Sequence, residues 1–320
     1  MLCRRTFIAS IALAPFARPA AATVWPLKVI RIIYPYAAGS AADGAARLLA
    51  QRLTEAFGQP VIVENRVGAN GTLAAQAVAR AAADGYTLFW AATPQIAISP
   101  AMTKVPYDPV KDFTPLSAVL TNTFVLIVNP QMLVKTLAEF VEYARVRSEL
   151  VYAQGGTGSI SHLTMAMFLK RAGLEMPAVS YQGNAPALND VIAGHVPTMV
   201  SVLGDAVPHI ASGSVRALAV SGDRRSPQLP DIPTIAESGY PGFQATSWNG
   251  LLAPAGIPVA IVRRIATEVA RIAREPTFVE RLTSIGVEPV GNSPEEFEAM
   301  IAADIALWPD ALRAAGIKSH

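Results

Sequence analysis

The sequence predicts an α/β fold of two lobes, each a mixed sheet flanked by helices. Strand and helix patterns alternate along most of the 320 residues, which is typical of parallel or mixed sheets that helices cover on both faces. Two breaks in the pattern, near 121–124 and 221–230, divide the chain. With 52% apolar and 16% charged residues, the chain can bury cores large enough for two domains.

Residues 1–22 have the pattern of a secretory signal peptide. Arg4 and Arg5 precede a short apolar run that ends at Ala17, and the small residues up to Ala22 fit a cleavage site. The apolar run is too short to span a bilayer, which needs a helix of about 20 residues. The arginine pair also permits export by the twin-arginine route, and the sequence leaves that choice open.

Removal of this segment changes the charge of the chain. It takes away three arginines, no acid and the only cysteine, Cys3, so the net charge falls from +2 to −1. A nearly neutral chain has no positive field that would gather nucleic acid, and we expect no such partner. A chain without thiols forms no disulfides, so its stability must come from its cores.

The first predicted lobe begins with an apolar strand over 29–34. A helix over 41–57 follows, and Gly58 ends it at a position that favours left-handed backbone. The remaining elements of this part are a strand over 61–64, a helix between the glycines of 68–85, and a strand over 86–93.

The second predicted lobe spans 124–221 and alternates in the same way. Its strands are expected over 124–130, 150–154, 178–183, 196–203 and 215–222, and its helices over 137–147, 161–173 and 184–195. The last hundred residues show two or three helices but little strand, so these helices need the sheet of the first lobe to cover. Lobe 1 is therefore predicted as 23–123 with 222–320, and the two crossings form a hinge with a cleft between the lobes.

Two turns from strand to helix carry the functional prediction. The first reads YPYAAGSAADG (34–44), and the second reads YAQGGTGSISH (152–162). Each ends at a helix N-terminus, where unpaired backbone N–H groups and the helix dipole favour an anion. Such loops lie at the carboxyl ends of strands, so we expect one from each lobe to face the cleft. Ser40, Thr157 and Ser159 can add hydroxyl donors.

Other kinds of site fit less well. Neither turn has the glycine spacing of a dinucleotide site or the Gly-Lys-Ser/Thr of a P-loop. Ser159 and His162 suggest a secreted hydrolase as an alternative, but the G-x-S-x-G elbow and an orienting acid are missing. The four histidines have no zinc spacing, so we expect no metal and no cofactor. A cytosolic effector-sensing domain would share the architecture, but the signal segment and the lack of a DNA-binding module disfavour it.

Two residues have two interpretations each. Asp43 either complements the dipole at the start of its helix or receives a ligand amine or hydroxyl. Trp248 either packs in a core or hinge or lines the cleft.

Nearly all of the chain after the signal segment resembles the Bug family, the extracytoplasmic solute receptors of tripartite tricarboxylate transporters. The resemblance lies in blocks that occur in order, among them WPLKVIRIIYPYAAGSAAD, GQPVIVENRVGANG, YAQGGTGSISHL, YQGNAPALNDVIAGHV and LPDIPTIAESGYPGF. It implies a type II-like periplasmic binding protein, a monomer without catalysis, that closes on a small carboxylate. It also implies membrane subunits of such a transporter as partners.

The resemblance also implies the residues of the site. In lobe 1 the expected ligand-binding residues are Tyr36, Ala38, Gly39, Ser40, Asp43 and Thr93, and in lobe 2 they are Gly156, Thr157, Gly158, Ser159, His162, Asn184, Ala185 and Ser201. Three positions depart from the family pattern: Ala42 lacks a hydroxyl, Ser201 stands where an acid is common, and Val67 replaces a common proline. The missing acid argues against an amino-acid ligand, and the length of the ligand and its number of carboxylates stay open.

Overall fold

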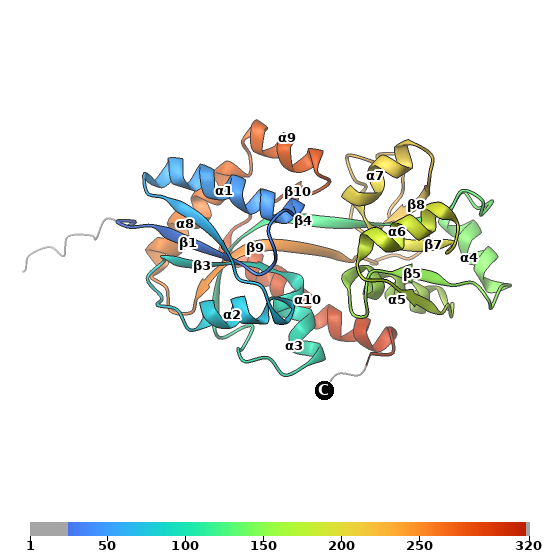
Figure 1. The fold of residues 1–320 in the computed structure, drawn as a ribbon, viewed down its shortest axis with the longest axis horizontal. Coiled ribbons are helices and arrows are strands. Elements are labelled where there is room, and N and C mark those ends of the chain that lie inside the picture. Colours follow the sequence, from blue (N-terminus) through green and yellow to red (C-terminus); the bar gives the residue numbers. More distant parts are fainter. Residues whose placement is uncertain (1–24, 318–320) are drawn as a thin grey trace, which may run out of the picture.

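The computed structural model describes residues 25–317, so the predicted signal peptide lies outside the described part. Two lobes lie side by side, and the long strands β4 and β9 run between them (Figure 1). The strands are β1 (Ile30–Tyr34), β2 (Val61–Asn65), β3 (Thr87–Ala92), β4 (Phe113–Val128), β5 (Tyr152–Gln154), β6 (Ala178–Ser180), β7 (Thr198–Val202), β8 (Arg216–Val220), β9 (Thr246–Pro254) and β10 (Glu288–Pro289).

Helices cover both sheets. They are α1 (Ala41–Phe57), α2 (Thr72–Ala79), α3 (Ser99–Met102), α4 (Leu137–Arg145), α5 (Ile160–Ala172), α6 (Asn184–Ala193), α7 (Leu203–Ala211), α8 (Val259–Ile272), α9 (Pro276–Ser284) and α10 (Pro294–Ala314), with the helical turns η1 (Ala69–Gly71) and η2 (Pro94–Ile98). No helix within residues 25–317 is long and apolar enough to cross a bilayer.

Both sheets are mixed, as predicted. In lobe 1 the strand order is β2-β1-β3-β9-β4, and β10 pairs with β4. The pairs of β1 with β2 and β3 are parallel, whereas β9 is antiparallel to both β3 and β4. In lobe 2 the second half of β4 continues the order as β4-β7-β5-β6, and β8 also pairs with β4. A single strand, β4, therefore belongs to both sheets.

Lobe 1 has an apolar core on each face of its sheet. Side chains of α1, α8 and α9 pack on one face, and side chains of α2 and α10 pack on the other. The predicted start and end of α1 are confirmed. The Ser40 hydroxyl accepts the amide N–H of Asp43 (3.1 Å), and Gly58 closes the helix in the left-handed region at φ 65°.

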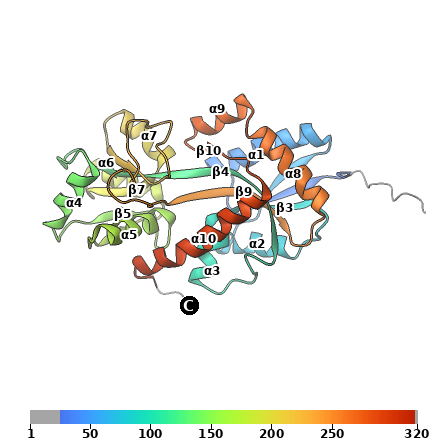
Figure 2. The same cartoon turned by 180° about the vertical axis from the view of Figure 1, so that it is seen from behind.

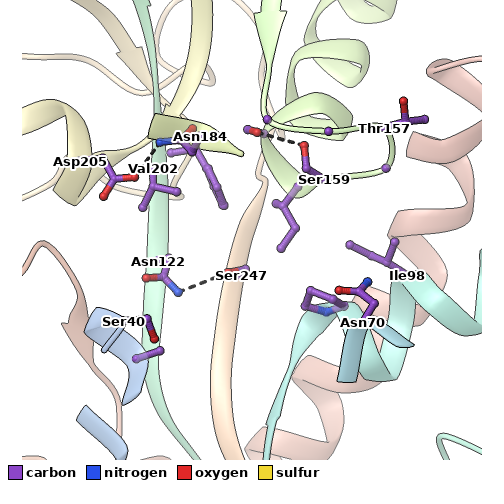
Figure 3. A pocket seen from close by; sticks show the side chains of 18 of the residues that line it. Ser40, Asn70, Ile98, Asn122, Thr157, Ser159, Asn184, Val202, Asp205 and Ser247 are labelled. Atoms are coloured by element: carbon purple, nitrogen blue, oxygen red, sulfur yellow. Dashed lines mark hydrogen bonds between the residues drawn. The ribbon is translucent and has the colours of Figure 1, made fainter. Parts of the chain in front are cut away.

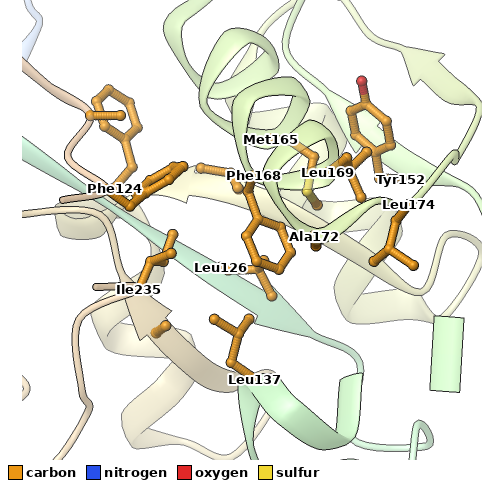
Figure 4. Packing of buried hydrophobic residues seen from close by; sticks show 14 of the residues in the cluster. Phe124, Leu126, Leu137, Tyr152, Met165, Phe168, Leu169, Ala172, Leu174 and Ile235 are labelled. Carbon is orange, nitrogen blue, oxygen red and sulfur yellow. The ribbon is translucent and has the colours of Figure 1, made fainter. Parts of the chain in front are cut away.

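Lobe 2 is built in the same way. Leu137 of α4 and Phe168 and Leu169 of α5 pack against β4 on one face of its sheet, where Leu126 faces them (Figure 4). The residues of α6 and α7 form the core on the other face. Helices on both faces bury the strands of lobe 2, which explains their nearly continuous apolar runs.

The return to lobe 1 comes later than the predicted residue 222. Ile235, Phe243 and Ala245 pack in the core of lobe 2, and the chain crosses on β9, which begins at Thr246. The loop-rich stretch predicted there thus contains a strand that lies between β3 and β4. Trp248 on this strand is buried, in agreement with the packing interpretation.

Helix α10 makes a third connection between the lobes. Its first half places Phe297 and Ile301 in the core of lobe 1, and its second half places Trp308 and Leu312 in the core of lobe 2. Figure 2 shows α10 running obliquely from one lobe to the other. The sequence predicts two crossings, and the structure adds this helix to them.

Candidate functional site

A cavity of about 720 Å³ lies between the lobes. Loops of both lobes and the two long strands line it (Figure 3). The lining residues are Ser40, Ala41, Ala42, Asn70, Pro94, Ile98 and Met102 from lobe 1, Asn122, Phe124 and Ser247 from the long strands, and Gly155 to Ser161, Asn184, Val202 and Asp205 from lobe 2.

Four helices start at this cavity. Ser40 and Ser159 are the N-caps of α1 and α5, and their hydroxyl oxygens accept the amide N–H groups of Asp43 and His162. Helices α6 and α7 begin at Asn184 and directly after Val202. The other first-turn amides of a helix have no acceptor within it, and the positive ends of four dipoles add up. The cavity is thus suited to bind an anion without a cationic side chain.

The first predicted loop is held from behind by Asp43. This buried carboxylate accepts hydrogen bonds from the Gly39 amide (3.1 Å), from two Arg47 nitrogens (both 3.0 Å) and from Asn65 Nδ2 (3.3 Å). Burial raises the pKa of Asp43, but these hydrogen bonds outweigh it, and the net pKa lies below the ordinary value. Asp43 does not line the cavity, so it shapes the loop and supports the start of α1.

Tyr36 also supports the loop instead of lining the cavity. Its hydroxyl accepts from Gln95 Nε2 (2.6 Å), which donates to the Asn70 carbonyl as well (3.0 Å). Gln95 Oε1 accepts the amide of Ala92 at the end of β3 (3.1 Å). The fully buried Gln95 thus joins three loops on the lobe 1 side, a role that no sequence motif indicates.

The second predicted loop lines the cavity from Gly155 to Ser161. Gly156 and Gly158 have φ angles of 124° and 78°, which L side chains rarely adopt. The Gly158 amide donates to His162 Nδ1 (3.1 Å), so this ring nitrogen carries no proton. Burial lowers the pKa of His162, in keeping with a neutral ring. The histidine fixes the loop from within lobe 2 and does not line the cavity.

The hydrolase alternative has no support in this geometry. The Ser159 hydroxyl lies 3.2 Å from the Ser161 hydroxyl and accepts the backbone N–H of His162 at 3.3 Å. The His162 ring bonds to Gly158 and makes no hydrogen bond to Ser159. A nucleophile and its base must be within hydrogen-bonding reach of each other, and here the base is engaged elsewhere. Within residues 25–317 no three potential ligands come together to hold a metal.

The third part of the wall is built on Asn184. Its Nδ2 donates to Ser201 Oγ (3.2 Å) and to Asp205 Oδ2 (2.7 Å). Ser201 is fully buried behind Asn184, and neither Ser201 nor Ala185 lines the cavity. The sequence does not indicate that Asp205 lines the cavity. Asp205 lies on α7, and Gly204 and Pro208 make this segment look unlike a helix, because both residue types disfavour helix formation.

Three further predicted residues lie outside the cavity. Gly39 lines a separate hollow between α1 and α9, and Ala38 is exposed. Thr93 is fully buried, and its hydroxyl donates to Asp304 on α10 (3.1 Å) and accepts the backbone N–H of Trp248 (3.2 Å). Thr93 therefore ties β3 to β9 and α10. Of the fourteen predicted residues, those that line the cavity are Ser40, Gly156, Thr157, Gly158, Ser159 and Asn184.

Replacing Asp304 with asparagine is expected to stabilise the protein at neutral pH. The carboxylate accepts from Thr93 and from Trp248 Nε1 (2.8 Å), but no cation within residues 25–317 forms an ion pair with it. Burial raises the pKa of Asp304 from 3.8 to about 6, because the hydrogen bonds offset desolvation only in part. Asparagine keeps an acceptor oxygen without the charge.

The sign follows from proton binding. Between pH 3.8 and about 6 the folded protein binds more protons at Asp304 than the unfolded chain, so stability falls as the pH rises through this window. After allowance for partial exposure, we expect Asp304→Asn to gain about 1–2 kcal/mol at pH 7.5. Urea unfolding at pH 7.5 and at pH 4 measures the free energy of unfolding of both proteins, and the gain from Asp304→Asn should vanish at pH 4. A variant less stable at both values would contradict this account.

The comparisons with known proteins agree with the fold and the cavity. A family model described as the tripartite tricarboxylate transporter family receptor matches residues 45–317. Protein BugT of Bordetella pertussis (strain Tohama I) is 33% identical over 311 residues, which cover 96% of this chain and 95% of BugT.

Two solved structures from Rhodopseudomonas palustris are similar along nearly the whole chain. Rpa4515 with adipate is 36% identical, with a TM-score of 0.77, and the matched region covers 92% of this chain and 99% of the Rpa4515 chain. MatC (Rpa3494) with bound malate is 33% identical, with a TM-score of 0.73, and the matched region covers 90% of this chain and 100% of the MatC chain. The resemblance to the Bug proteins is thereby confirmed, and the chain belongs to the tripartite tricarboxylate transporter receptor family.

Proposed function

We propose that this protein is a periplasmic receptor that captures a small organic carboxylate between its lobes and performs no chemistry on it. The observation that carries the proposal is the meeting of the capped starts of α1 and α5, one from each lobe, at a single cavity. The ligands named for the similar structures, adipate and malate, are carboxylates of a size that such a cavity accommodates.

The proposed binding residues in the cavity are Ser40 in lobe 1 and the loop from Gly156 to Ser159 in lobe 2. The amides of Gly158 and Ser159 donate within lobe 2, to His162 Nδ1 and to the Gly156 carbonyl. The amides of Gly156 and Thr157, with the hydroxyls, would therefore donate to the carboxylate. Each charge-assisted hydrogen bond contributes about 1.5–3 kcal/mol before ordering costs. A few of them supply the roughly −8 kcal/mol of micromolar binding. Asp43, Tyr36 and His162 hold the two loops that carry these donors.

Calorimetry of the exported protein, freed of ligand by dialysis, tests the proposal against a panel of mono-, di- and tricarboxylates. We expect one carboxylate to bind at a 1:1 ratio with micromolar or tighter affinity. Ser159→Ala should weaken this binding and leave a stable protein, whereas a hydrolase would lose turnover of an ester substrate outright. Absence of binding across the panel would overturn the proposal.

The location of the protein and its partners belong to the same proposal. We expect cleavage after Ala22, so that the mature chain begins at Thr23, and export into the periplasm. Intact-mass measurement of the protein from a periplasmic extract checks both points. In the periplasm the monomeric, liganded receptor would dock on the membrane subunits of a tripartite tricarboxylate transporter.

A further inference from the structure

Asp205 is the only charged side chain among the described residues that line the interlobe cavity. Its presence is unexpected in a site that binds anions, because a carboxylate in the wall repels a second carboxylate nearby. Figure 3 shows Asp205 beside Asn184 on the lobe 2 side, with Ser40 on the lobe 1 side of the cavity. The exposed Asp205 carboxylate is available to a donor group of a ligand.

Asp205 has one structural role, because it stands in the first turn of α7, where its charge complements the dipole of that helix. It does not cap the helix, since no side chain does. No lysine, arginine or histidine within residues 25–317 forms an ion pair with Asp205. Asn184 Nδ2 donates a hydrogen bond to Asp205 Oδ2, and no donor of the described residues reaches Oδ1.

Asn184 offers a ligand no donor at this wall. Its two amide protons are used by Ser201 and Asp205, so Nδ2 has no proton left for a ligand. Its Oδ1 is buried without a hydrogen-bond partner within residues 25–317. The wall at α6 and α7 thus offers a ligand the exposed Asp205 carboxylate and no proton from Asn184, whereas the capped starts of α1 and α5 present donors.

We propose that the ligand carries a hydrogen-bond donor, an ammonium or a hydroxyl group, close to a carboxylate, and that Asp205 selects it. This inference rests on the proposed function. The carboxylate would take the amides of the two capped helix starts, and the donor group would pair with the Asp205 carboxylate. A carboxylate without such a group leaves Asp205 unpaired and meets its repulsion. Ser201 stands where an acid is common in the family, but the site still contains an acid, because Asp205 on the next helix, α7, supplies one.

Ligand pairs of equal length test the proposal by calorimetry. Succinate, malate and aspartate differ in one group at one carbon, as do glutarate and glutamate. In whichever series the wild type binds, we expect the compound with the hydroxyl or ammonium group to bind at least tenfold more tightly than the plain dicarboxylate. Malate and aspartate distinguish a hydroxyl from an ammonium group.

Asp205→Asn keeps an acceptor for Asn184 and removes the charge. It should reduce the preference at least tenfold, with binding of the plain dicarboxylate unchanged or tighter. The matched control is Asp231→Asn, which makes the same charge change on an exposed residue of lobe 2 outside the cavity. The control should leave every affinity unchanged.

Two results would overturn the inference while the proposed function stands. One is equal binding of succinate and its donor-bearing analogues by the wild type. The other is an equal loss for all ligands in Asp205→Asn, which would mean that Asp205 only positions Asn184. If no carboxylate binds at all, the proposed function fails, and this inference fails with it.

Discussion

A Trp308→Ala variant is expected to lose about 3–5 kcal/mol of stability, the range for truncation of a fully buried tryptophan. Trp308 is completely buried in the core of lobe 2, although it stands on α10, whose first half belongs to the core of lobe 1. The large side chain anchors the end of α10 beside α5. Its removal leaves a cavity that the neighbouring side chains fill only in part.

Urea unfolding gives the loss in stability, and hydrogen exchange shows where it acts. We expect faster exchange in the second half of α10, around 305–314, and unchanged protection around 297–301 in lobe 1. Trp308→Phe, which keeps most of the apolar volume, should cost less than half as much. If the end of α10 stays as protected as in the wild type, it is not held by Trp308.

A Gly156→Ala variant is expected to bind its carboxylate about 10- to 100-fold more weakly. Gly156 has φ 124°, and the nearest heavy atom to an added Cβ is the Tyr181 carbonyl oxygen at 3.9 Å. The cost therefore comes from the backbone, at about 1–3 kcal/mol for a strained residue. The loop can relieve this strain only by shifting the amides that face the cavity, so the loss appears in affinity.

Gly173→Ala is the matched control, because this glycine closes the other end of the same helix, α5. It also has a positive φ, 65°, and no heavy atom lies within 4 Å of an added Cβ. We expect it to cost about 1 kcal/mol of stability without a change in Kd. Calorimetry and urea unfolding on both variants separate the two effects. Equal affinity of Gly156→Ala and the wild type would mean that the loop does not bind the ligand.

The local parts of the structure could be predicted from the sequence. The limits of α1 follow from a serine cap, an amphipathic run and Gly58, all of which act within a few residues. The starts of α1 and α5, two of the four helix starts at the cavity, are predictable for the same reason. By contrast, β9 escaped prediction because Asn249, Gly250 and Pro254 interrupt its apolar pattern. Its place in the sheet depends on pairing with β3 and β4, which lie far away in the sequence.

The residues of the site that depend on long-range pairing were also missed. Asn122 and Ser247 line the cavity because β4 and β9 place them opposite each other, with Asn122 Nδ2 3.4 Å from Ser247 Oγ. The role of Gln95 can be recognised only from the structure, where its side chain links three loops. Five predicted residues lie one layer behind the cavity: Tyr36, Asp43, Thr93, His162 and Ser201. A sequence motif does not distinguish a side chain that contacts a ligand from one that holds the contacting loop.

The third connection through α10 has a mechanical consequence. The two neighbouring strands β4 and β9 alone would form a narrow ribbon, about which one lobe could twist against the other. A helix that is embedded in both cores and packs against one of these strands resists the twist. We therefore expect the two lobes to twist against each other less than two strands alone would allow.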